Sequence, residues 1–336
     1  MRALLVRPGP NFSVQDVANG WQQGLTEAGV EVRDFDLGAA MAFYEMALRT
    51  EDDDSEATGR KAAYMAASAL RAAAFDWWPD IVLIVSSFFV PPETYQMLRA
   101  RRMKVVTLFT ESPYEDTSQQ LIAAHTDVAI VNDPTNLAGF QTVNPNSFYL
   151  PHAYNPQVHC PGPATDEFRS EFCFVGTGYP SRIGFFEQCD FTGIDVALAG
   201  NWANLGEDSP LRKHVAHDLA HCLENSDAVE MYRSTLISAN IYRTEHNHDG
   251  NADGWAMGPR EVELAACGTF FLTQERGENR DILPMVPTFE GPADLSDAIR
   301  WWLAHPDLRA DVAAEAQAAI ADRTFTNHAR QLLAWL

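Results

Sequence analysis

A single carboxylate stands in the run from Val262 to Cys267, which otherwise predicts a buried helix. The segment "GPREVELAACGTFFLTQ" (258–274) opens with a Gly-Pro break, and its helical part ends at a glycine, with Glu263 interrupting an apolar run. Proline favours the first position of a helix and glycine the residue beyond its end. A buried carboxylate destabilises a fold unless it is paired or hydrogen-bonded. Either Glu263 pairs with an arginine such as Arg260 or Arg243, or its oxygens accept hydrogen bonds from a ligand's hydroxyls.

A glycine turn follows a predicted strand and has residue types that can face a phosphate. The turn "GTGYPSR" (176–182) comes directly after "FCFV" and leads into a helix near Pro180. Backbone N–H groups of such a turn and the start of a helix can bind a phosphate. The pattern lacks a full G-x-G-x-x-G, and the chain has no G-x-x-x-x-G-K-[ST], so dinucleotide and P-loop chemistry are not predicted. By itself the turn is more simply interpreted as an ordinary one.

A polar, glycine-rich stretch, 243–261, leads into the helix that holds the carboxylate. Its His246, His248, Asp249 and Asp253 are of types that bind metals. No second cluster supplies further ligands at a fixed spacing, so we interpret the stretch as a polar loop.

Glu111 is the candidate for proton transfer in the first half of the chain. In "TLFTESPYED" (107–116) it follows a predicted strand directly. A carboxylate at a strand end can serve as a general base. It can also cap the helix that follows, which is the structural alternative.

The composition limits the classes of molecule that the chain is expected to bind. Of 336 residues 46% are hydrophobic, the formal net charge is −22, and the only lysines are Lys61, Lys104 and Lys213. Binding of nucleic acid or anionic lipid draws on a surplus of Lys and Arg, so direct nucleic-acid binding is disfavoured. An anion site in this chain has to use arginines or backbone N–H groups.

The cysteines and the hydropathy pattern favour a cytoplasmic location. The five cysteines are odd in number and form no C-x-x-C pair, which is typical of a reduced compartment. The short apolar run in "MRALLVRPGP" predicts a strand rather than a signal peptide. No stretch approaches the ~20 apolar residues of a membrane span.

Short apolar runs that alternate with amphipathic stretches predict an α/β fold. In the first half the expected strands are Ala3–Arg7, Glu31–Phe35, Asp80–Ser86, Lys104–Thr110 and Asp127–Asn132. Helical stretches are expected around 13–28, 56–75, 92–101 and 117–124. Continuous apolar strands such as "DIVLIVSS" are typical of a parallel sheet that is covered on both faces.

A second alternating series begins after a proline-rich linker at "YLPHAYNPQVHCPGPATDEF". Its expected strands are Phe172–Val175, Asp195–Ala199, Thr235–Tyr242, Thr269–Thr273 and Pro287–Phe289. Its expected helices lie near 180–188, 210–224, 259–267, 294–304, 307–321 and 327–336. We therefore expect two Rossmann-like domains facing a central cleft. In such sheets ligands sit beyond the carboxyl ends of the strands, and a cleft between domains is the default site.

Several segments resemble glycosyltransferases of the group-1 class, closest to the subset that includes the spore-maturation CgeB-like proteins. They are "FVGTGYPSRIGFFE", "YLPHAYNP" and "PREVELAACGTFFLTQ". Those chains commonly show Arg-x-Phe-Glu, then small residues and a glycine. Here Arg260, Val262 in place of Phe, Glu263 and Gly268 meet that pattern. The resemblance covers 148–336, while over 1–147 it rests on element order and on "FTESPY".

The resemblance implies a B-type glycosyltransferase fold and a division of the chain. Residues 1–150 would form the acceptor-side Rossmann-like domain and 151–322 the nucleotide-sugar donor domain. Residues 323–336 would form a C-terminal helix that could pack back on the first domain.

The resemblance also assigns roles to residues. The glutamate of this helix commonly contacts the donor's ribose hydroxyls, the helix N-terminus and nearby arginines face the diphosphate without a metal, and the turn and the "AGNW" loop complete the pocket. The implied donor-binding residues are Gly176, Thr177, Arg182, Trp202, Arg243, Gly258, Arg260 and Glu263.

One position departs from the family pattern. Many retaining relatives carry a second glutamate eight positions before this one, and here that position is Trp255. Glu245 or Asp253 could supply the missing carboxylate. If the enzyme inverts, Glu111 is the expected base; if it retains, catalysis rests on stabilising the leaving diphosphate.

The function implied by the resemblance is a metal-independent glycosyltransferase. It would move a sugar from a nucleotide-diphosphate sugar to a hydroxyl acceptor, with no cofactor besides this donor. A soluble glycan, a protein or a small molecule is favoured as acceptor. Two alternatives stay open: a nucleotide-sugar epimerase or hydrolase of the same fold, and a non-catalytic sugar-nucleotide-binding protein.

Overall fold

The computed structural model describes residues 1–10, 14–49, 55–86, 88–220, 222–246 and 253–336. It divides into two compact units. The first unit consists of Met1–Pro151, His246–Gly254 and Phe325–Leu336, and the second of His152–Glu245 and Trp255–Thr324.

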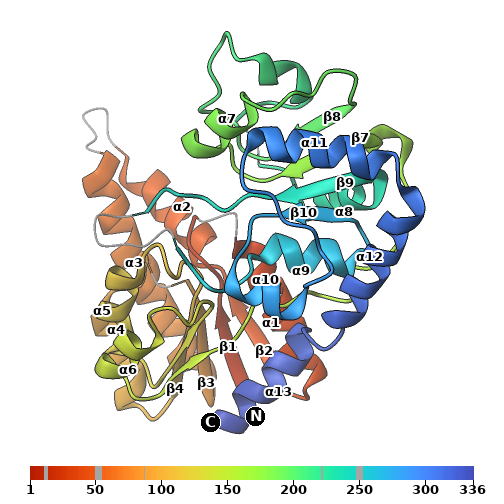
Figure 1. The fold of residues 1–336 in the computed structure, drawn as a ribbon. Helices are drawn as coiled ribbons and strands as arrows, with labels where there is room; N and C mark the ends of the chain where they lie inside the picture. The colour runs from red at the N-terminus through yellow and green to blue at the C-terminus, as the bar shows by residue number, and fades with distance from the viewer. Residues whose placement is uncertain (11–13, 50–54, 87, 221, 247–252) are drawn as a thin grey trace. The chain divides into compact units, whose positions relative to one another are not determined.

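The first unit is built on a parallel sheet. In the described residues the sheet has six strands in the order β2-β1-β3-β4-β5-β6 (Figure 1). The strands are β1 (Arg2–Val6), β2 (Glu31–Phe35), β3 (Ile81–Val85), β4 (Lys104–Phe109), β5 (Val128–Val131) and β6 (Ser147–Tyr149). Every residue of β3 is buried, as expected for a central strand covered on both faces.

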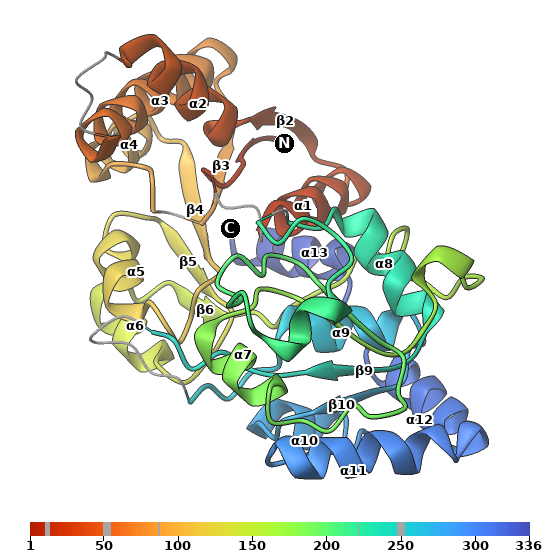
Figure 2. The same cartoon turned by 90° about the horizontal axis from the view of Figure 1, so that it is seen from above.

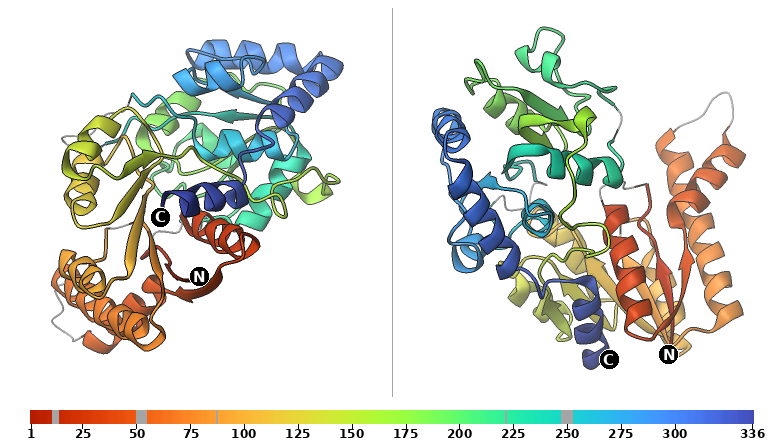
Figure 3. Two further views of the ribbon diagram at one scale, coloured as in Figure 1. Left: turned by 90° about the horizontal axis from the view of Figure 1, so that it is seen from below. Right: turned by 90° about the vertical axis from the view of Figure 1, so that its right-hand side faces the viewer.

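The helices of the first unit cover this sheet. They are α1 (Gln15–Glu27), α2 (Leu37–Leu48), α3 (Ser55–Trp77), α4 (Pro92–Ala100), α5 (Asp116–Ala123), α6 (Leu137–Val143) and α13 (Phe325–Trp335). Helices α2 and α3 form an antiparallel pair (Figure 3). The pair packs on the face of the sheet formed by Leu4, Val6, Val82 and Ile84.

The C-terminal helix α13 lies beside α1 (Figure 2). Two glycines of α1 allow the close approach. A Cβ at Gly24 would lie 2.5 Å from the carbonyl oxygen of Phe325, and one at Gly20 would lie 2.1 Å from the Phe325 ring. The end of the chain therefore belongs to the first unit.

The second unit has a smaller parallel sheet, with the order β10-β9-β7-β8 among the described residues. Its strands are β7 (Ser170–Val175), β8 (Val196–Ala199), β9 (Thr235–Asn240) and β10 (Phe271–Thr273). Its helices are α7 (Pro180–Phe186), α8 (Asn225–Ser234), α9 (Pro259–Ala266), α10 (Gly277–Ile282), α11 (Pro292–Leu303) and α12 (Pro306–Ala319).

Alternate residues of β7 build two cores. Phe172 and Phe174 face a cluster with α7 and α11, while Cys173 and Val175 face a cluster with α8, α9 and α12. Both cores are apolar because successive side chains of a strand point to opposite faces. Helix α9 is therefore held against one face of the sheet, with its start near the carboxyl ends of β7 and β9.

Most predicted elements are confirmed, and two are wrong. The predicted helix at 210–224 reduces to a short 3-10 helix, Pro210–His214, because the chain beyond it is tied to a loop: the N–H of Trp202 donates to the carbonyl of Leu219 at 2.7 Å. The predicted strand Pro287–Phe289 forms only a bridge between Thr288 and Thr273.

Five α-helices and strands in the described residues lie where no such element was predicted. They are β6, α2, α6, α8 and α10. Three of them, β6, α6 and α10, span only three to seven residues, too few for a clear hydrophobic period. Within the described residues no helix is long and apolar enough to cross a membrane.

Candidate functional site

The predicted donor-site residues of the second unit gather at one edge of its sheet. Gly176 follows β7, Gly200 follows β8, Asn240 ends β9, and Gly258 starts α9. A Cβ at Gly200 would lie 2.5 Å from the carbonyl oxygen of Gly176, and Gly200 has a φ of +107°. Glycine is therefore required where these two strand ends come together.

Arg260 fills the space between these strand ends. Its Nε donates to the carbonyl of Val175 at 2.6 Å, and its Nη1 donates to Oδ1 of Asn240 at 2.8 Å. The guanidinium lies 4.5 Å from the centre of the Phe174 ring. A Cβ at Gly176 would lie 2.2 Å from its Nη2, so this glycine makes room for the guanidinium.

The positive charge of Arg260 is not balanced by an ion pair within the described part of the chain. None of the ion pairs among the described residues includes it. Its planar group is fixed by two hydrogen bonds and a ring contact, and Nη2 stays available for another acceptor. A fixed guanidinium of this kind is suited to bind a phosphate or carboxylate oxygen.

Asn240 adds an unused donor beside this guanidinium. The residue is 2% exposed, and its Nδ2 has no hydrogen-bond partner among the described residues. Buried polar atoms without a partner are rare in folded proteins, so this N–H group calls for an acceptor. Sequence analysis missed Asn240, although its place as the last residue of a buried strand was a usable signal.

Two backbone N–H groups of the glycine turn are already used within the protein. The N–H of Gly176 donates to the carbonyl of Ala199 at 2.8 Å, and the N–H of Gly178 donates to that of Asn201 at 2.7 Å. Both groups hold the turn against the neighbouring strand end. The turn therefore shapes the site, and these two N–H groups are not available to an anion.

Arg182 supports this turn. It is 8% exposed, and its Nη1 donates to the carbonyl of Thr177 at 3.0 Å. Its Nε and Nη2 both donate to the carbonyl of Ile241, at 3.0 and 2.7 Å. These bonds link the turn after β7 to the chain after β9, and they explain why β9 stops short of the predicted Tyr242.

Arg243 and Trp202 also lie around the turn. Nη1 of Arg243 donates to the Tyr179 hydroxyl at 3.2 Å. Trp202 is fully buried, donates from Nε1 to the carbonyl of Ala199 at 3.1 Å, and packs against Phe174. Its side chain packs beneath the loop that follows β8 and has no exposed surface for a ligand to contact.

The buried carboxylate of α9 is Glu261 rather than Glu263, which corrects the starting assumption about this helix. Glu261 is 0% exposed. It accepts four hydrogen bonds: from the Tyr242 hydroxyl, from the N–H of Gly258 at 2.8 Å, from the Thr273 hydroxyl at 2.8 Å and from Nδ2 of Asn279 at 3.0 Å. Burial raises the pKa of Glu261, and these hydrogen bonds oppose the rise.

Glu261 therefore has a structural role. Its partners come from the chain after β9, the end of β10 and α10, so one carboxylate joins three segments to the start of α9. Its place three residues after the N-cap Gly258 is the signal that sequence analysis missed, because an acidic residue at this position commonly reaches back to the cap.

Glu263 is half-buried and far less engaged. Among the described residues its side chain meets only the Tyr232 hydroxyl, at 3.5 Å. The predicted alternative of an ion pair with Arg260 or Arg243 is therefore wrong for the described structure. Its oxygens have capacity left for further donors such as hydroxyl groups.

The carboxylates proposed to replace the second family glutamate lie in different places. Glu245 accepts hydrogen bonds from the N–H and the hydroxyl of Ser181, both at 2.9 Å, at the start of α7. Burial alone would raise the pKa of Glu245, but these bonds outweigh it and the pKa lies below its usual range. Asp253 belongs to the first unit, and Trp255 packs against Gly277 in the second.

The polar loop gives no sign of a metal site in the residues that the structure describes. His248 and Asp249 lie outside them. Among the others, no group of three or more His, Cys, Asp or Glu side chains is placed to hold a metal ion.

Glu111 lies in the first unit, two residues beyond the end of β4, and is half-buried. Its N–H donates to Oε1 of Gln119 at 3.2 Å. The N-cap of α5 is Glu115, so the predicted capping role of Glu111 is not observed.

Comparison with known proteins agrees with this architecture. Residues 182–334 match the sequence model of a family described as glycosyl transferase-like. No curated protein sequence matches the chain significantly. The matched region includes α9 and the residues Arg182, Asn240, Arg260 and Glu263.

Three solved structures are similar over nearly the whole chain. Sucrose-phosphate synthase from Thermosynechococcus elongatus has a TM-score of 0.66 at 11% identity, over 99% of this chain and 98% of its own. HepE from Anabaena, in complex with UDP and glucose, has 0.63 at 12%, over 100% of both chains. A putative UDP-N-acetylglucosamine 2-epimerase from Listeria monocytogenes has 0.63 at 10%, over 99% and 95%.

At these identities the likeness establishes the fold. The chain has two Rossmann-like domains with parallel sheets, as in B-type glycosyltransferase structures, and the predicted fold class is confirmed.

Proposed function

We propose that this protein is a glycosyltransferase that moves a sugar from a nucleotide-diphosphate sugar to a hydroxyl acceptor, with the donor held by the second unit. The observation that carries the proposal is the pairing of Arg260 and Asn240 at the strand ends. Both present unused N–H groups, and no carboxylate balances the guanidinium among the described residues. A diphosphate would supply the acceptors and the negative charge that this pair lacks.

The donor's other parts would be held by the neighbouring residues. The half-buried Glu263, with only a long contact to Tyr232, would accept hydrogen bonds from the ribose hydroxyls. The loop after β8 closes against the turn after β7 through the bond from the N–H of Gly178 to the carbonyl of Asn201 and would border the base. Arg182, whose bonds to Ile241 and Thr177 are already made, would position the turn rather than touch the phosphates.

Catalysis would rest on the charge that develops on the leaving diphosphate. When the bond to the sugar breaks, negative charge grows on the diphosphate oxygen, and Arg260 and Asn240 would stabilise it as fixed donors. This arrangement neutralises the leaving group with protein side chains and needs no metal. Glu111 of the first unit is the proposed base for an inverting reaction.

Thermal unfolding with added nucleotides tests the donor site directly. UDP, UDP-glucose and the other nucleoside diphosphates would be added to the wild type, to Arg260→Ala and to a control, Arg169→Ala, which removes an exposed arginine of the same unit. A ligand at ~100 times its Kd adds about 2.7 kcal/mol to the folded state. We expect one nucleotide to stabilise the wild type and the control but not Arg260→Ala. Equal stabilisation of the wild type and both variants would show that Arg260 does not contribute to nucleotide binding.

The Listeria structure of a putative epimerase with the same fold supports a second candidate function. A nucleotide-sugar epimerase or hydrolase would use the same donor site without an acceptor. Incubation of the protein with the stabilising nucleotide sugar alone separates the two functions. Release of free sugar or formation of an epimer at catalytic rates favours the second, whereas turnover that depends on an added acceptor favours transfer.

Trp255 stands where many relatives have a second glutamate, and this keeps a third candidate open. A non-catalytic sugar-nucleotide-binding protein would show the same thermal shift with the same dependence on Arg260. It would show no turnover with any acceptor of the glycan, protein or small-molecule classes.

A further inference from the structure

Three buried side-chain oxygens of the first unit have no hydrogen-bond partner among the described residues. They are Oγ of Ser86, Oγ1 of Thr110 and Oδ1 of Asp116. Buried polar atoms without a partner are rare in folded proteins, and they indicate a missing partner such as a ligand. Neither the proposed donor site nor the proposed base uses any of these three residues.

The three residues lie at one edge of the six-stranded sheet. Ser86 follows β3, Thr110 follows β4, and Asp116 begins α5, the helix after β4. Strands β3 and β4 are neighbours, and the N–H of Ser86 donates to the carbonyl of Leu108 at 3.0 Å. Ligands of open parallel sheets bind beyond the carboxyl ends of the strands, so these oxygens lie where a ligand is expected. We call Ser86, Thr110 and Asp116 the β3–β4 edge site.

Ser86 has a backbone conformation that serine rarely adopts. Its φ is +58°, in the left-handed region, and the residue is 4% exposed. This conformation is unfavourable for a residue with a Cβ, and it is found most often at functional sites. The hydroxyl has no partner among the described residues, so no hydrogen bond from it compensates for the strain. The strain is therefore a second sign of function at the same edge.

The loop between β4 and α5 is tied to the end of β5. The N–H of Ser112 donates to Oδ1 of Asn132, and Nδ2 of Asn132 donates to the carbonyl of Ser112, both at 3.2 Å. Nδ2 of Asn136 donates to Oδ2 of Asp116 at 2.5 Å. One oxygen of Asp116 therefore holds the carboxyl group in place, and the other can accept a hydrogen bond from a ligand.

The polar groups of the β3–β4 edge site match the hydroxyl groups of a sugar. A serine or threonine hydroxyl both donates and accepts hydrogen bonds, and a carboxyl oxygen accepts them. Burial raises the pKa of Asp116, and the hydrogen bond from Asn136 opposes the rise. Burial thus favours the neutral form of this carboxyl group, which attracts cations less than the ionised form does.

This edge of the sheet lacks a cation that could bind a phosphate. Among the described residues in the two positions after each strand of the first unit, the only Lys or Arg is Arg7. Arg7 pairs with Asp34 at 2.6 Å and also donates to Asn19 and Gln22. The segments outside the described residues contain no lysine or arginine. A phosphorylated ligand would therefore lack a counter-charge at this edge.

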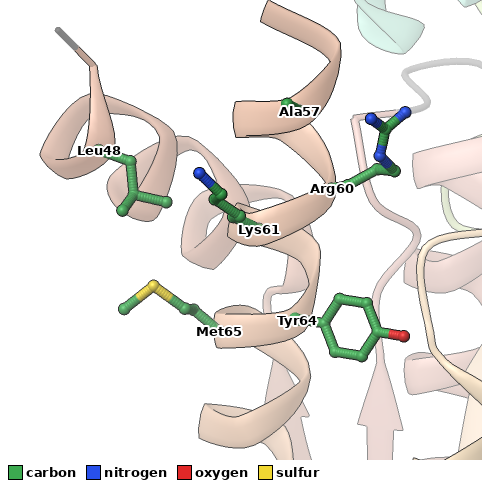
Figure 4. Close-up of a pocket in the computed structure, with 6 residues that line it drawn as sticks. All are labelled: Leu48, Ala57, Arg60, Lys61, Tyr64 and Met65. Atoms are coloured by element: carbon green, nitrogen blue, oxygen red, sulfur yellow. The ribbon is translucent and has the colours of Figure 1, made fainter. Parts of the chain in front are cut away.

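The groove between α2 and α3 fits a sugar less well. It has a volume of about 550 Å³ and is lined by Leu48, Ala57, Arg60, Lys61, Tyr64 and Met65 (Figure 4). None of the unpartnered buried atoms in the described part of the chain belongs to this lining. The segment 50–54, which joins the two helices, lies outside the described residues, and we assign no ligand to this groove.

We propose that the β3–β4 edge site binds the acceptor of the transfer reaction and that this acceptor is an uncharged sugar. The proposal rests on the proposed function, because it names the molecule that receives the transferred sugar. Two hydroxyl groups of the acceptor bond to Ser86 and Thr110, and a third donates to Asp116. Glu111, the proposed base for an inverting reaction, is the residue after Thr110, so the acceptor binds beside the group that takes its proton.

Saturation-transfer difference NMR with the full chain tests the site without a donor. Glucose, galactose, mannose and N-acetylglucosamine would each be compared with its 6-phosphate. We expect at least one neutral sugar to bind and its phosphate to bind at least about tenfold more weakly, which corresponds to about 1.4 kcal/mol. Equal or tighter binding of the phosphate, or no binding of any neutral sugar, overturns the proposal.

Two substitutions separate a ligand-binding role from a structural one. Thr110→Val removes the hydroxyl at nearly constant shape, and Ser86→Gly removes it while suiting the positive φ. Neither hydroxyl has a partner among the described residues, so thermal stability should not fall. The affinity for the sugar should fall about three- to tenfold in each variant. Ser118→Ala, exposed on α5, is the control and should change neither property. Lower stability with unchanged affinity would show that the hydroxyls serve the fold, and it would overturn the proposal.

This proposal and the proposed function can fail separately. Turnover of a nucleotide sugar that requires a phosphorylated acceptor overturns the uncharged acceptor and leaves the proposed function intact. Absence of nucleotide binding, together with neutral-sugar binding that depends on Ser86 and Thr110, overturns the proposed function and retains the sugar site.

Discussion

The two glutamates of α9 stand two residues apart, yet the protein satisfies them to different extents. Glu261 is fully buried and accepts four hydrogen bonds, while Glu263 is half-buried and, among the residues that the structure describes, is hydrogen-bonded only by the Tyr232 hydroxyl at 3.5 Å. Two other residues of the candidate site are also incompletely bonded. Arg260 has no ion-pair partner, and Asn240 keeps an unbonded N–H group among the described residues.

This difference distinguishes a residue that supports the fold from a residue that is able to bind a ligand. A buried polar group with complete hydrogen bonds stabilises the arrangement around it, and removing it leaves its partners unsatisfied. A buried polar group with incomplete bonds costs free energy in the absence of a ligand, so its presence indicates that a ligand completes it. The first description fits Glu261, and the second fits Arg260 and Asn240.

The largest effect on stability is expected from Glu261→Ala. The substitution removes one acceptor from each of four donors, including the Tyr242 hydroxyl and the N–H of Gly258. We expect the free energy of unfolding to fall by about 3–5 kcal/mol in urea denaturation. Glu263→Ala is the matched control and should cost less than about 1 kcal/mol. Similar losses of stability in both variants would contradict the different roles of Glu261 and Glu263.

The largest effect on activity is expected from Arg260→Lys. A lysine keeps the charge but cannot bond Val175, Asn240 and a phosphate in one plane. We expect kcat/KM for donor turnover to fall by about 10²–10³-fold, as for the loss of one fixed donor to a developing anion. Arg169→Lys, on an exposed arginine, should leave the rate unchanged. A rate within a factor of about two of wild type would exclude Arg260 from the reaction.

A smaller and more selective effect is expected from Glu263→Gln. If Glu263 accepts hydrogen bonds from the ribose hydroxyls, the substitution should lower the affinity for the nucleotide by about tenfold, because a charge-assisted hydrogen bond is replaced by a neutral one. Isothermal titration with ribo- and deoxyribonucleotides provides the test. The wild type should discriminate between the two sugars, and the variant should discriminate much less. Undiminished discrimination would place the ribose elsewhere.

The smallest effect concerns the pH dependence of stability. Burial raises the pKa of Glu261 above 4.5, so the folded state binds this proton more tightly than the unfolded state. The contribution is fully present below the unfolded pKa and is lost as the pH rises through the folded pKa. The stability of wild type relative to Glu261→Gln should therefore decline as the pH rises above about 4.5, by about 1.4 kcal/mol per unit of pKa shift. A difference independent of pH would contradict the raised pKa.

Much of the fold was predictable because it depends on local patterns. Continuous apolar strands such as Ile81–Val85 can be recognised from a few neighbouring residues. The same is true of the glycine and proline that precede α9. The segment 210–224 was not predictable in this way. Its apolar residues have helical spacing, but a hydrogen bond from Trp202 to Leu219 holds it to a distant loop.

The candidate site was predictable in part. The strand-end rule and the family resemblance identified Arg260 and Glu263 together with the glycine turn. They did not show that Arg182 already donates to the carbonyls of Ile241 and Thr177, or that Asn240 keeps an unused donor. Whether a donor is free depends on which carbonyls lie beside it, and these come from residues far away in the sequence.

The sequence by itself determined that this chain alternates strands and helices and that a short helix begins at Pro259 after a glycine. Only the tertiary structure decided which glutamate of that helix is buried. Glu261 and Glu263 are about 200° apart around the helix axis, and apolar residues surround both. The packing of α9 against β9 and β10 fixes its rotation, and with it which carboxylate is buried and fully hydrogen-bonded and which is half-buried.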